Sequence, residues 1–364
     1  MLATPLSEKL TADGKTKMGE YCGVQTPLSF GDTPGEFADL LHRCGVYDLG
    51  WRAHLRIRGQ DRVRWLNGMV SNNTRDLPAG HGNYNFLLSA QGRIQGDLYV
   101  YNCGEEYIAE TDFSQLENIL KLLRKYIIMD KVELADLREE ITAIGVQGPD
   151  ARSILAKAEI SGPLPEALEL RVTEWKGRRV LVTRMATEPR DSFELWTAPS
   201  EVHALWNALQ SAGAKPVGAD ALEFFRVAAG IPRYGIDIRS QDLPQETAQM
   251  QALCFTKGCY IGQEIVERIR SRGSVHRTLA GFMIDGPPPE AGARVQAGGK
   301  DVGEITCAVE LPAAGTAQTQ ALALGYLRRE AAMPGFAVQV GNLSGLVSEL
   351  PFTSIFAKEH THAE

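Results

Sequence analysis

The segment Lys257-Gly258-Cys259-Tyr260-Ile261-Gly262-Gln263-Glu264 combines a cation, a thiol, a phenol, an amide and a carboxylate with two glycines. Glycine permits backbone conformations closed to other residues and lets a ligand or another chain approach closely. Lys257 precedes Cys259 by two residues, and a nearby cation lowers the pKa of a thiol and raises its thiolate fraction. The segment therefore predicts either a functional thiol at Cys259 or a tight turn around a buried cysteine.

The same segment belongs to a longer run, residues 225–278, which contains F-R-V-A-A-G-I-P-R-Y-G-I-D-I, P-Q-E-T, F-T-K-G-C-Y-I-G-Q-E-I-V-E-R and G-S-V-H-R-T. This run resembles the signature of YgfZ-type folate-binding proteins. The resemblance implies tetrahydrofolate as cofactor, and a role in the assembly or repair of iron–sulfur proteins that needs Cys259. Iron–sulfur client proteins or assembly factors would then be its partners. It also implies that four residues of the segment border the folate: Lys257, Tyr260, Gly262 and Gln263.

The rest of the chain is similar to the wider superfamily of the T protein, the aminomethyltransferase of the glycine cleavage system. The matching stretches are 21–31, 47–59, 80–101, 146–149, 303–306 and 351–352. This likeness implies an α+β fold, a three-lobed T-protein-like cloverleaf. Two interleaved α+β lobes would make a folate-binding region of residues 1–273, and residues 274–364 would form a C-terminal β-barrel, with folate in the central opening.

Local patterns also predict helices and strands that alternate irregularly. A helix capped by Asp61 presents one apolar face, Ser114 and Glu117 form a capping box before a second apolar stripe, and a third helix runs from Ser200 until Gly213. Short strands are expected at 54–58, 86–88, 97–100, 144–146, 180–183 and 193–196. No regular βαβ rhythm occurs, so α+β is favoured over a doubly wound sheet. After about residue 275, glycine-spaced strands predict a separate small barrel or sandwich.

Composition limits the classes of function. A chain of 364 residues exceeds what one hydrophobic core usually supports, so two or three domains are expected. The formal net charge of -7 argues against general nucleic-acid binding, because no global positive field would attract phosphate. The six cysteines include no C-x-x-C pair, so their spacing predicts neither a disulfide framework nor a metal site. The first residues contain no apolar run, which favours a cytoplasmic protein with no membrane partner.

Asp97 is the candidate catalytic carboxylate. The T-protein pattern G-G-x-x-D-D-L corresponds here to G-R-I-Q-G-D-L, residues 92–98, so one carboxylate of the pair is retained. The resemblance implies that Asp97 orients the amine nitrogens of folate and accepts or shares a proton during group transfer. An aspartate at a strand end or turn is the alternative interpretation.

Three further residues are candidates for folate contacts by resemblance. Arg226 occupies the arginine of the T-protein R-L-x-A-G pattern, where a guanidinium can bind a carboxylate or a polar folate edge, although it can also pair with Glu223. Tyr84 matches a tyrosine beside the folate, with core packing as the alternative. Glu188 matches a glutamate of a T-G-E-x-G segment that here lacks both glycines. A D-V-S-H-M segment is also altered, since Trp51 and Arg52 replace its histidine and methionine.

Three functions remain open from sequence. The leading hypothesis is a folate-dependent accessory factor for iron–sulfur proteins that uses Cys259. The second is an aminomethyltransferase in which Asp97 assists attack of folate on a protein-bound aminomethyl group, giving methylene-tetrahydrofolate and ammonia. The third is a folate-regulated binding scaffold without chemistry, because one cysteine and one carboxylate do not define a catalytic constellation.

Overall fold

The computed structural model describes residues 2–10, 16–186, 190–273, 275–312 and 319–356. The chain forms two compact units: residues 1–222, 240–244 and 249–273 make the first, and residues 223–239, 245–248 and 274–364 make the second. The second unit thus includes two short segments that precede residue 274. A single boundary between residues 273 and 274 stays a prediction.

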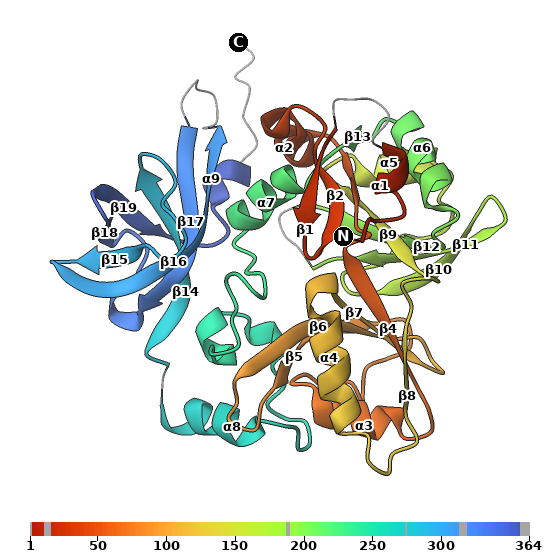
Figure 1. The fold of residues 1–364 in the computed structure, drawn as a ribbon, viewed down its shortest axis with the longest axis horizontal. Coiled ribbons are helices and arrows are strands. Elements are labelled where there is room, and N and C mark those ends of the chain that lie inside the picture. The colour runs from red at the N-terminus through yellow and green to blue at the C-terminus, as the bar shows by residue number, and fades with distance from the viewer. Residues whose placement is uncertain (1, 11–15, 187–189, 274, 313–318, 357–364) are drawn as a thin grey trace. The chain divides into compact units, whose positions relative to one another are not determined.

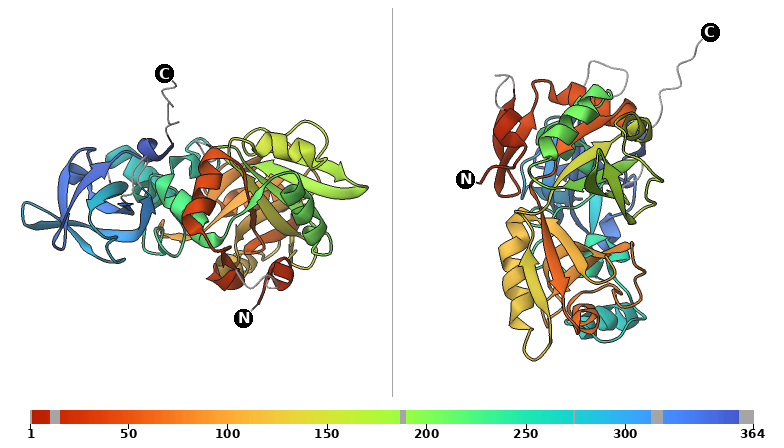
Figure 2. Two further views of the ribbon diagram at one scale, coloured as in Figure 1. Left: turned by 90° about the horizontal axis from the view of Figure 1, so that it is seen from above. Right: turned by 90° about the vertical axis from the view of Figure 1, so that its right-hand side faces the viewer.

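The first unit contains a five-stranded sheet with helices packed on one face. Its strand order is β5 (Gly82–Leu88), β6 (Ile94–Asn102), β7 (Tyr107–Asp112), β4 (Arg52–Arg58) and β8 (Glu133–Asp136). Helices α3 (Arg62–Met69) and α4 (Phe113–Lys125) bury apolar side chains against this face, where Leu55, Leu98 and Ala109 pack with Leu66 and Ile119. Figure 1 and the right-hand view of Figure 2 show α4 lying along one side of the sheet.

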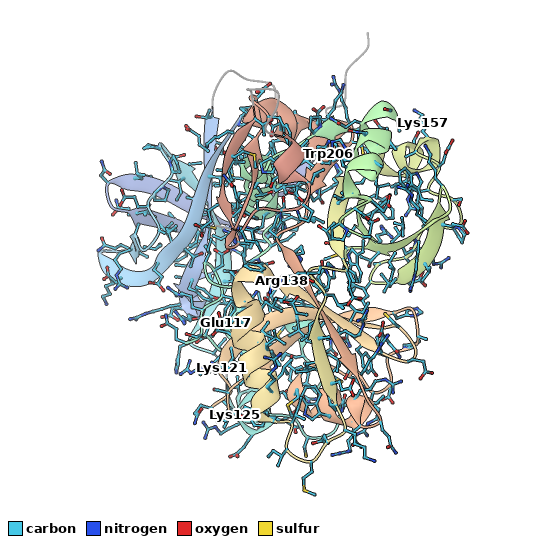
Figure 3. The ribbon with its side chains drawn as sticks, turned by 45° about the vertical axis from the view of Figure 1, so that its right-hand side comes forward. Glu117, Lys121, Lys125, Arg138, Lys157 and Trp206 are labelled. Atoms are coloured by element: carbon cyan, nitrogen blue, oxygen red, sulfur yellow. The ribbon has the colours of Figure 1, made fainter. Side chains whose placement is uncertain are left out.

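Helix α4 begins earlier than its sequence pattern predicts. Phe113 is its first residue and Asp112 its N-cap, so the predicted capping box of Ser114 and Glu117 lies inside the helix. Asp112 makes no side-chain capping bond, because its carboxylate pairs with Arg52 instead. The apolar stripe is as predicted. Figure 3 shows its exposed counterpart, Glu117, Lys121 and Lys125, along the opposite side of the helix.

A six-stranded sheet forms the second layer of the first unit. Its order is β10 (Leu170–Trp175), β11 (Arg178–Arg184), β12 (Ser192–Thr197), β9 (Thr142–Gln147), β3 (Gly45–Asp48) and β13 (Lys215–Pro216). Helices α5 (Ala151–Lys157) and α6 (Val202–Ser211) cover its apolar face, and α6 confirms the third predicted helix. The unit also contains α1 (Ser7–Leu10), β1 (Lys17–Tyr21), β2 (Val24–Ser29), α2 (Thr33–His42), a 3₁₀ turn (Met250–Ala252) and α8 (Gln263–Arg272).

The second unit contains a closed six-stranded barrel, as the glycine-spaced pattern predicts. Its strands are β14 (Arg277–Asp285), β17 (Thr319–Arg328), β16 (Lys300–Pro312), β15 (Arg294–Ala297), β18 (Ala337–Val340) and β19 (Leu343–Ser348). Gly303 and Gly325 permit close strand contact, since an added Cβ would lie 2.0 Å from the Tyr326 carbonyl oxygen and 2.3 Å from that of Glu304, respectively. Phe282, buried, lies in the barrel core.

The remaining elements are short. Helix α7 (Ala219–Ala228) contributes residues to both units, and the second unit also contains α9 (Thr353–Phe356) and 3₁₀ turns at Pro244–Thr247 and Arg329–Ala331. The α+β class and the barrel are therefore confirmed. In the described part of the chain, no helix is long and apolar enough to cross a membrane.

Candidate functional site

A layer of polar and aromatic side chains lies between the two sheets of the first unit. On the five-stranded sheet, alternation along the strands points these side chains away from α3 and α4. The ring of Trp196 on β12 lies 4.4 Å from that of His54 on β4 and 5.2 Å from that of Tyr101 on β6. Thr183 on β11 donates a hydrogen bond to the Tyr101 hydroxyl at 3.2 Å. These contacts join the sheets around a buried layer that holds ionisable groups.

Asp97 and Tyr84 lie together at one end of this polar layer. The Tyr84 hydroxyl donates to Asp97 Oδ2 at 2.6 Å, and Gln115 Nε2 donates to Asp97 Oδ1 at 2.7 Å. Burial raises the pKa of the Asp97 carboxyl, and the nearby Asp112 carboxylate raises it further, against these two hydrogen bonds and the Arg52 charge. The carboxyl is therefore fixed in orientation while its affinity for a proton is increased.

Arg52 forms a buried ion-pair cluster beside them. Its Nε donates to Glu110 Oε1 at 3.0 Å, and its Nη1 binds Asp112 Oδ1. Glu110 is completely buried and Asp112 nearly so. The guanidinium also lies 5.9 Å from the ring centre of Tyr99, whose ring is 5.0 Å from that of Tyr84. Arg52 thus connects the acidic pair to the aromatic side chains around Asp97.

Two buried carboxyl groups in this cluster, those of Glu110 and Glu194, have pKa values shifted in opposite directions. The side chains of Glu110 and Glu194 are joined by a hydrogen bond. Glu194 also accepts a hydrogen bond from Trp196, whose Nε1 lies 3.1 Å from Glu194 Oε2. Burial and the Glu110 charge raise the pKa of Glu194 well above its usual range. Burial opposes ionisation of Glu110 as well, yet Arg52 and His54 hold the pKa of Glu110 below its ordinary value. Glu194 is therefore the neutral acid that donates to the Glu110 carboxylate.

The sequence pattern around Glu194 indicates a buried acid, although the resemblance to the T protein points to Glu188. The predicted glutamate, Glu188, lies outside the described residues. Glu194 lies in the middle of β12, between the apolar residues Phe193 and Leu195. An acid in the interior of a central strand needs a buried partner, so this pattern indicates a polar site.

Replacing Glu194 with Gln is expected to remove a pH dependence of folding stability. Because the pKa of Glu194 is raised in the folded protein, its contribution to stability is fully present below its ordinary value of 4.5 and is lost as pH rises toward the raised value. Glutamine cannot ionise, so above about pH 5 the variant should gain on the wild type by up to ~1.4 kcal/mol per pH unit. Urea unfolding at several pH values measures this difference.

Glu110→Gln is the matched control for that experiment. It removes the ionised partner of Arg52 and should destabilise the fold by about 3 kcal/mol near neutral pH. If Glu194→Gln instead follows the wild-type curve at every pH, the pKa of Glu194 is not raised in the folded protein.

The segment 257–264 lies in the first unit around the start of α8. Lys257 is buried, and its Nζ donates to the carbonyl oxygens of Val70 at 2.8 Å and Asn72 at 2.5 Å. Burial lowers the pKa of Lys257 to about 7. The ammonium lies 5.0 Å from the ring centre of Tyr260, which is also buried, whereas Cys259 is exposed. The ammonium is thus fixed by backbone carbonyls. Against the effect of burial, the Thr256 hydroxyl lowers the pKa of the Cys254 thiol, and the Lys257 charge is a smaller cause in the same direction.

Gly262 and Gln263 form the turn into α8. Gly262 is the N-cap of the helix with φ of +83°, and Gln263 is the first helical residue. A Cβ at Gly262 would lie 2.7 Å from the Ser89 carbonyl oxygen. Both the positive φ and this close approach require glycine.

Arg226 belongs to the second unit, where acidic groups surround it. Its Nη1 donates to Asp237 Oδ2 at 2.6 Å and to the Ile231 carbonyl oxygen at 2.7 Å. Its Nε and Nη2 donate to Glu223, which is the internal pairing left open by the sequence. The Nη2 atom also lies 3.3 Å from the sulfur of Cys307. The predicted folate contact of Arg226 stays a prediction.

A cavity of about 510 Å³ opens beside Arg52 in the first unit. It is lined by residues 2, 3, 5, 24, 50, 52, 113, 136 and 138–142. The Arg138 guanidinium lies 5.0 Å from the ring centre of Phe113 on its wall, and Asp136 binds the same arginine. The volume falls within the roughly 300–1,000 Å³ typical of small-ligand sites. Arg52 therefore borders both this cavity and the polar layer.

The chain belongs to the GCVT family: residues 7–257 match the model of the GCVT N-terminal domain. Two curated relatives are aminomethyltransferases. That of Thermus thermophilus is 27% identical over 361 residues, covering 98% of this chain and 100% of the relative. That of Streptomyces coelicolor is 28% identical over 337 residues, covering 87% of each chain. A crystal structure of glycine cleavage system aminomethyltransferase T from Bartonella henselae matches with a TM-score of 0.85 at 21% identity, over 97% of this chain and 98% of that one.

These comparisons correct the function predicted from the cysteine segment. The T-protein superfamily is confirmed, but the relatives that span nearly the whole chain carry the name aminomethyltransferase, so the iron–sulfur accessory role was wrong and the second hypothesis fits better. Aminomethyltransferases of the GCVT family use tetrahydrofolate, in agreement with the predicted cofactor.

Proposed function

We propose that this protein is a tetrahydrofolate-dependent aminomethyltransferase that moves a one-carbon unit from a carrier thiol to folate and releases ammonia. The observation that carries the proposal is Asp97, a carboxyl group oriented by Tyr84 and Gln115 and given a raised pKa by burial. Such a group can hold a proton next to reacting amines. Membership of the GCVT family and the names of the relatives support the same reaction class.

The polar layer fits a reduced pterin, which carries both amine donors and a carbonyl acceptor. Asp97 offers a carboxyl acceptor, whereas the proton of Glu194 is already used in its hydrogen bond to Glu110. Gln147 Nε2 is buried and has no hydrogen-bond partner within the described residues, while Tyr47 donates to Gln147 Oε1 at 3.0 Å. Buried polar groups normally have a hydrogen-bond partner, so this amide hydrogen is available to an acceptor atom of a bound ligand. Donors and acceptors of the kinds that pterin needs are therefore present.

Each residue of the cluster has a distinct role in this proposal. Tetrahydrofolate supplies the amine nitrogens that receive the carbon. Asp97 accepts or shares the proton that those amines lose, and Tyr84 fixes the carboxyl through its hydroxyl. Arg52 keeps Glu110 ionised, which in turn keeps the proton on Glu194. The ring of Tyr99 packs against that of Tyr84, with ring centres 5.0 Å apart.

Tetrahydrofolate is expected to bind saturably in isothermal titration calorimetry. Tyr84→Phe should weaken binding by about 0.5–1.5 kcal/mol, because the ring remains but Asp97 loses a neutral hydrogen bond. Tyr84→Ala should weaken it further, since the aromatic surface is lost as well. Equal affinity in all three proteins would remove Tyr84 from the folate site.

The transfer itself is tested with an aminomethylated lipoyl carrier protein and tetrahydrofolate. The expected products are methylene-tetrahydrofolate, ammonia and the free carrier thiol in equal amounts. A second donor, a small aminomethyl thioether, tests whether Trp51 and Arg52 alter recognition of the carrier. Tight folate binding with no ammonia from either donor would contradict the transferase proposal and support the binding-scaffold hypothesis.

Within the family, we propose the YgfZ-type branch on the pattern of residues 225–278. Its support is the glycine-dependent turn at Gly262 and the buried Lys257 and Tyr260, which give the segment a defined structure. The proposal is that the chain is related by descent to the YgfZ-type proteins and binds folate as they do. Gly262→Val is expected to lose folate binding and to lower the thermal unfolding midpoint, because valine cannot adopt the positive φ of this turn. Folate binding that is unchanged would separate the segment from the cofactor.

A further inference from the structure

Lys257 holds two backbone carbonyl groups that lie two residues apart. Its Nζ donates to the carbonyl oxygens of Val70 at 2.8 Å and Asn72 at 2.5 Å, and the residue is only 9% exposed. Val70 is the C-cap of α3, where the negative end of the helix dipole favours a cation. In the described chain, the titratable groups that act on this ammonium are Cys254 and Arg75 rather than a carboxylate. Lys257 is therefore placed by the backbone that follows α3.

The residues between these two carbonyl groups also bind strand β5. The Ser71 N–H donates to the Phe86 carbonyl oxygen at 3.0 Å, and the Phe86 N–H donates to Ser71 Oγ at 2.8 Å. Asn72 Nδ2 donates to the Tyr84 carbonyl oxygen at 3.1 Å. The Asn72 N–H donates to Asn85 Oδ1, also at 3.1 Å. Three consecutive residues of β5 are thus held from one side.

The same two residues are bonded on their other side to the chain that leads into α8. Ser71 Oγ donates to the Ala252 carbonyl oxygen at 2.6 Å, and the Cys254 N–H donates to the Ser71 carbonyl oxygen at 3.1 Å. Asn72 Nδ2 also donates to the Gln251 carbonyl oxygen at 2.8 Å. The stretch after α3 is therefore fixed between β5 and this part of the chain.

Strand β5 carries the phenol that orients the candidate catalytic carboxyl. The Tyr84 hydroxyl donates to Asp97 Oδ2 at 2.6 Å, and Phe86 is the Cα partner of Asp97 in the pairing of β5 with β6. Two hydrogen bonds connect Lys257 to Tyr84, one from Nζ to the Asn72 carbonyl oxygen and one from Asn72 Nδ2 to the Tyr84 carbonyl oxygen. Because a hydrogen bond weakens steeply when its donor is misaligned, a shift of Asn72 would loosen the grip of Tyr84 on Asp97.

The contact with the two carbonyl groups does not need the charge of Lys257. Burial lowers the pKa of Lys257 to about 7. A neutral amine still has two N–H donors, one for each carbonyl oxygen. The lysine can therefore hold the stretch after α3 on both sides of neutral pH.

We propose that Lys257 is a positioning residue of the transferase site, which acts through Asn72 to hold the Tyr84 hydroxyl against Asp97. The proposal rests on the proposed role of Asp97 in aminomethyl transfer. It gives the lysine of the segment 257–264 a function that does not require Cys259.

Titration of the Asp97 carboxyl by carbon-13 NMR, in the folate-free full-length protein, tests the proposal. The Tyr84 hydrogen bond lowers the pKa of Asp97, so its loss should move the titration midpoint to higher pH. Lys257→Met should raise the midpoint by up to about one pH unit, and Asn72→Ala should do the same. The double variant should shift it no further than the larger single change, because both changes break one connection. Additive shifts would overturn the route through Asn72.

Leu205→Ala is the control for a loss of stability alone. Leu205 lies fully buried on α6, in the core of the other sheet. Its truncation should lower the thermal unfolding midpoint but leave the Asp97 titration as in the wild type. The same result for Lys257→Met would show that Lys257 only packs. If Lys257→Met fails to fold, Asn72→Ala decides the question, because Asn72 is partly exposed and an unmoved Asp97 titration there would overturn the proposal.

Transfer assays on the same proteins separate this proposal from the proposed function. An active wild type whose Asp97 titration is unmoved in Lys257→Met would keep the transferase and overturn the positioning role. A shifted titration in a protein that releases no ammonia from either donor would support the route from Lys257 to Asp97 and contradict the transferase.

Discussion

Replacing Asp97 with Asn is expected to lower kcat for aminomethyl transfer by roughly 10²–10⁴-fold, the range seen when a general acid–base group is lost. Asparagine keeps the size of the side chain, accepts the hydrogen bond from Gln115 through its oxygen and can donate through its amide nitrogen to the Tyr84 hydroxyl, but it cannot take up a proton. Tetrahydrofolate affinity should therefore change little. Single-turnover kinetics together with calorimetry distinguish the two effects.

The pH profile gives a second measure of the same role. Burial raises the pKa of Asp97, so the ionised form that accepts a proton is lost as pH falls through that raised value. The wild-type rate should show this acidic limb, and Asp97→Asn should lack it. Asp136→Asn is the matched control, because this half-buried carboxylate pairs with Arg138 at the cavity wall. A kcat within threefold of wild type in Asp97→Asn would exclude the proposed role.

The contact between Asp97 and Tyr84 could be predicted from the sequence. Asp97 lies in the strand predicted at 97–100, and Tyr84 lies two residues before the strand predicted at 86–88, which in the structure begins earlier as β5; β5 and β6 are neighbours along the chain that pair antiparallel. Adjacent strands joined by a short turn bring same-face residues together, so the resemblance and the period of two agree on this contact. The barrel was predictable for a similar reason, because its glycines recur where strands meet closely.

The acidic cluster was not predictable, because three strands from distant parts of the sequence build it. Arg52 and Glu110 are 58 residues apart and become cross-strand neighbours only through the pairing of β4 with β7. Glu194 arrives from the second sheet. The alternation of apolar and polar residues along one strand does not say which strands of two sheets face each other. The sequence therefore shows only a single charged residue in each strand, and not the cluster that they form.

Lys257 shows a different limit of sequence spacing. Two residues separate it from Cys259 along the chain, yet its ammonium points to the carbonyl oxygens of Val70 and Asn72. Val70 is the C-cap of α3 and Asn72 follows it, so both carbonyl groups are far from Lys257 in the sequence. A long, flexible side chain points to those buried carbonyl oxygens that have no other hydrogen-bond partner. A sequence motif does not show where such oxygens lie in the fold.

The Arg52→Met variant is expected to destabilise the fold by about 3–5 kcal/mol at neutral pH. Methionine fills a similar volume but leaves the Glu110 and Asp112 carboxylates buried without their common cation. Arg138→Met is the matched control, because its ion pair with Asp136 is partly exposed and should cost less than ~1 kcal/mol. Urea unfolding of both variants measures the difference.

The double variant Arg52→Met with Glu110→Gln identifies the cause of this loss. Removing one stranded charge should recover about half of the destabilisation, whereas a loss due to packing alone would persist. The deficit of Arg52→Met should also shrink as pH falls, since without the cation the pKa of Glu110 rises in the folded state and protonation relieves the buried charge. A deficit below ~1 kcal/mol, or one that does not depend on pH, would mean that water or neighbouring donors already solvate these carboxylates and that Arg52 does not keep Glu110 ionised.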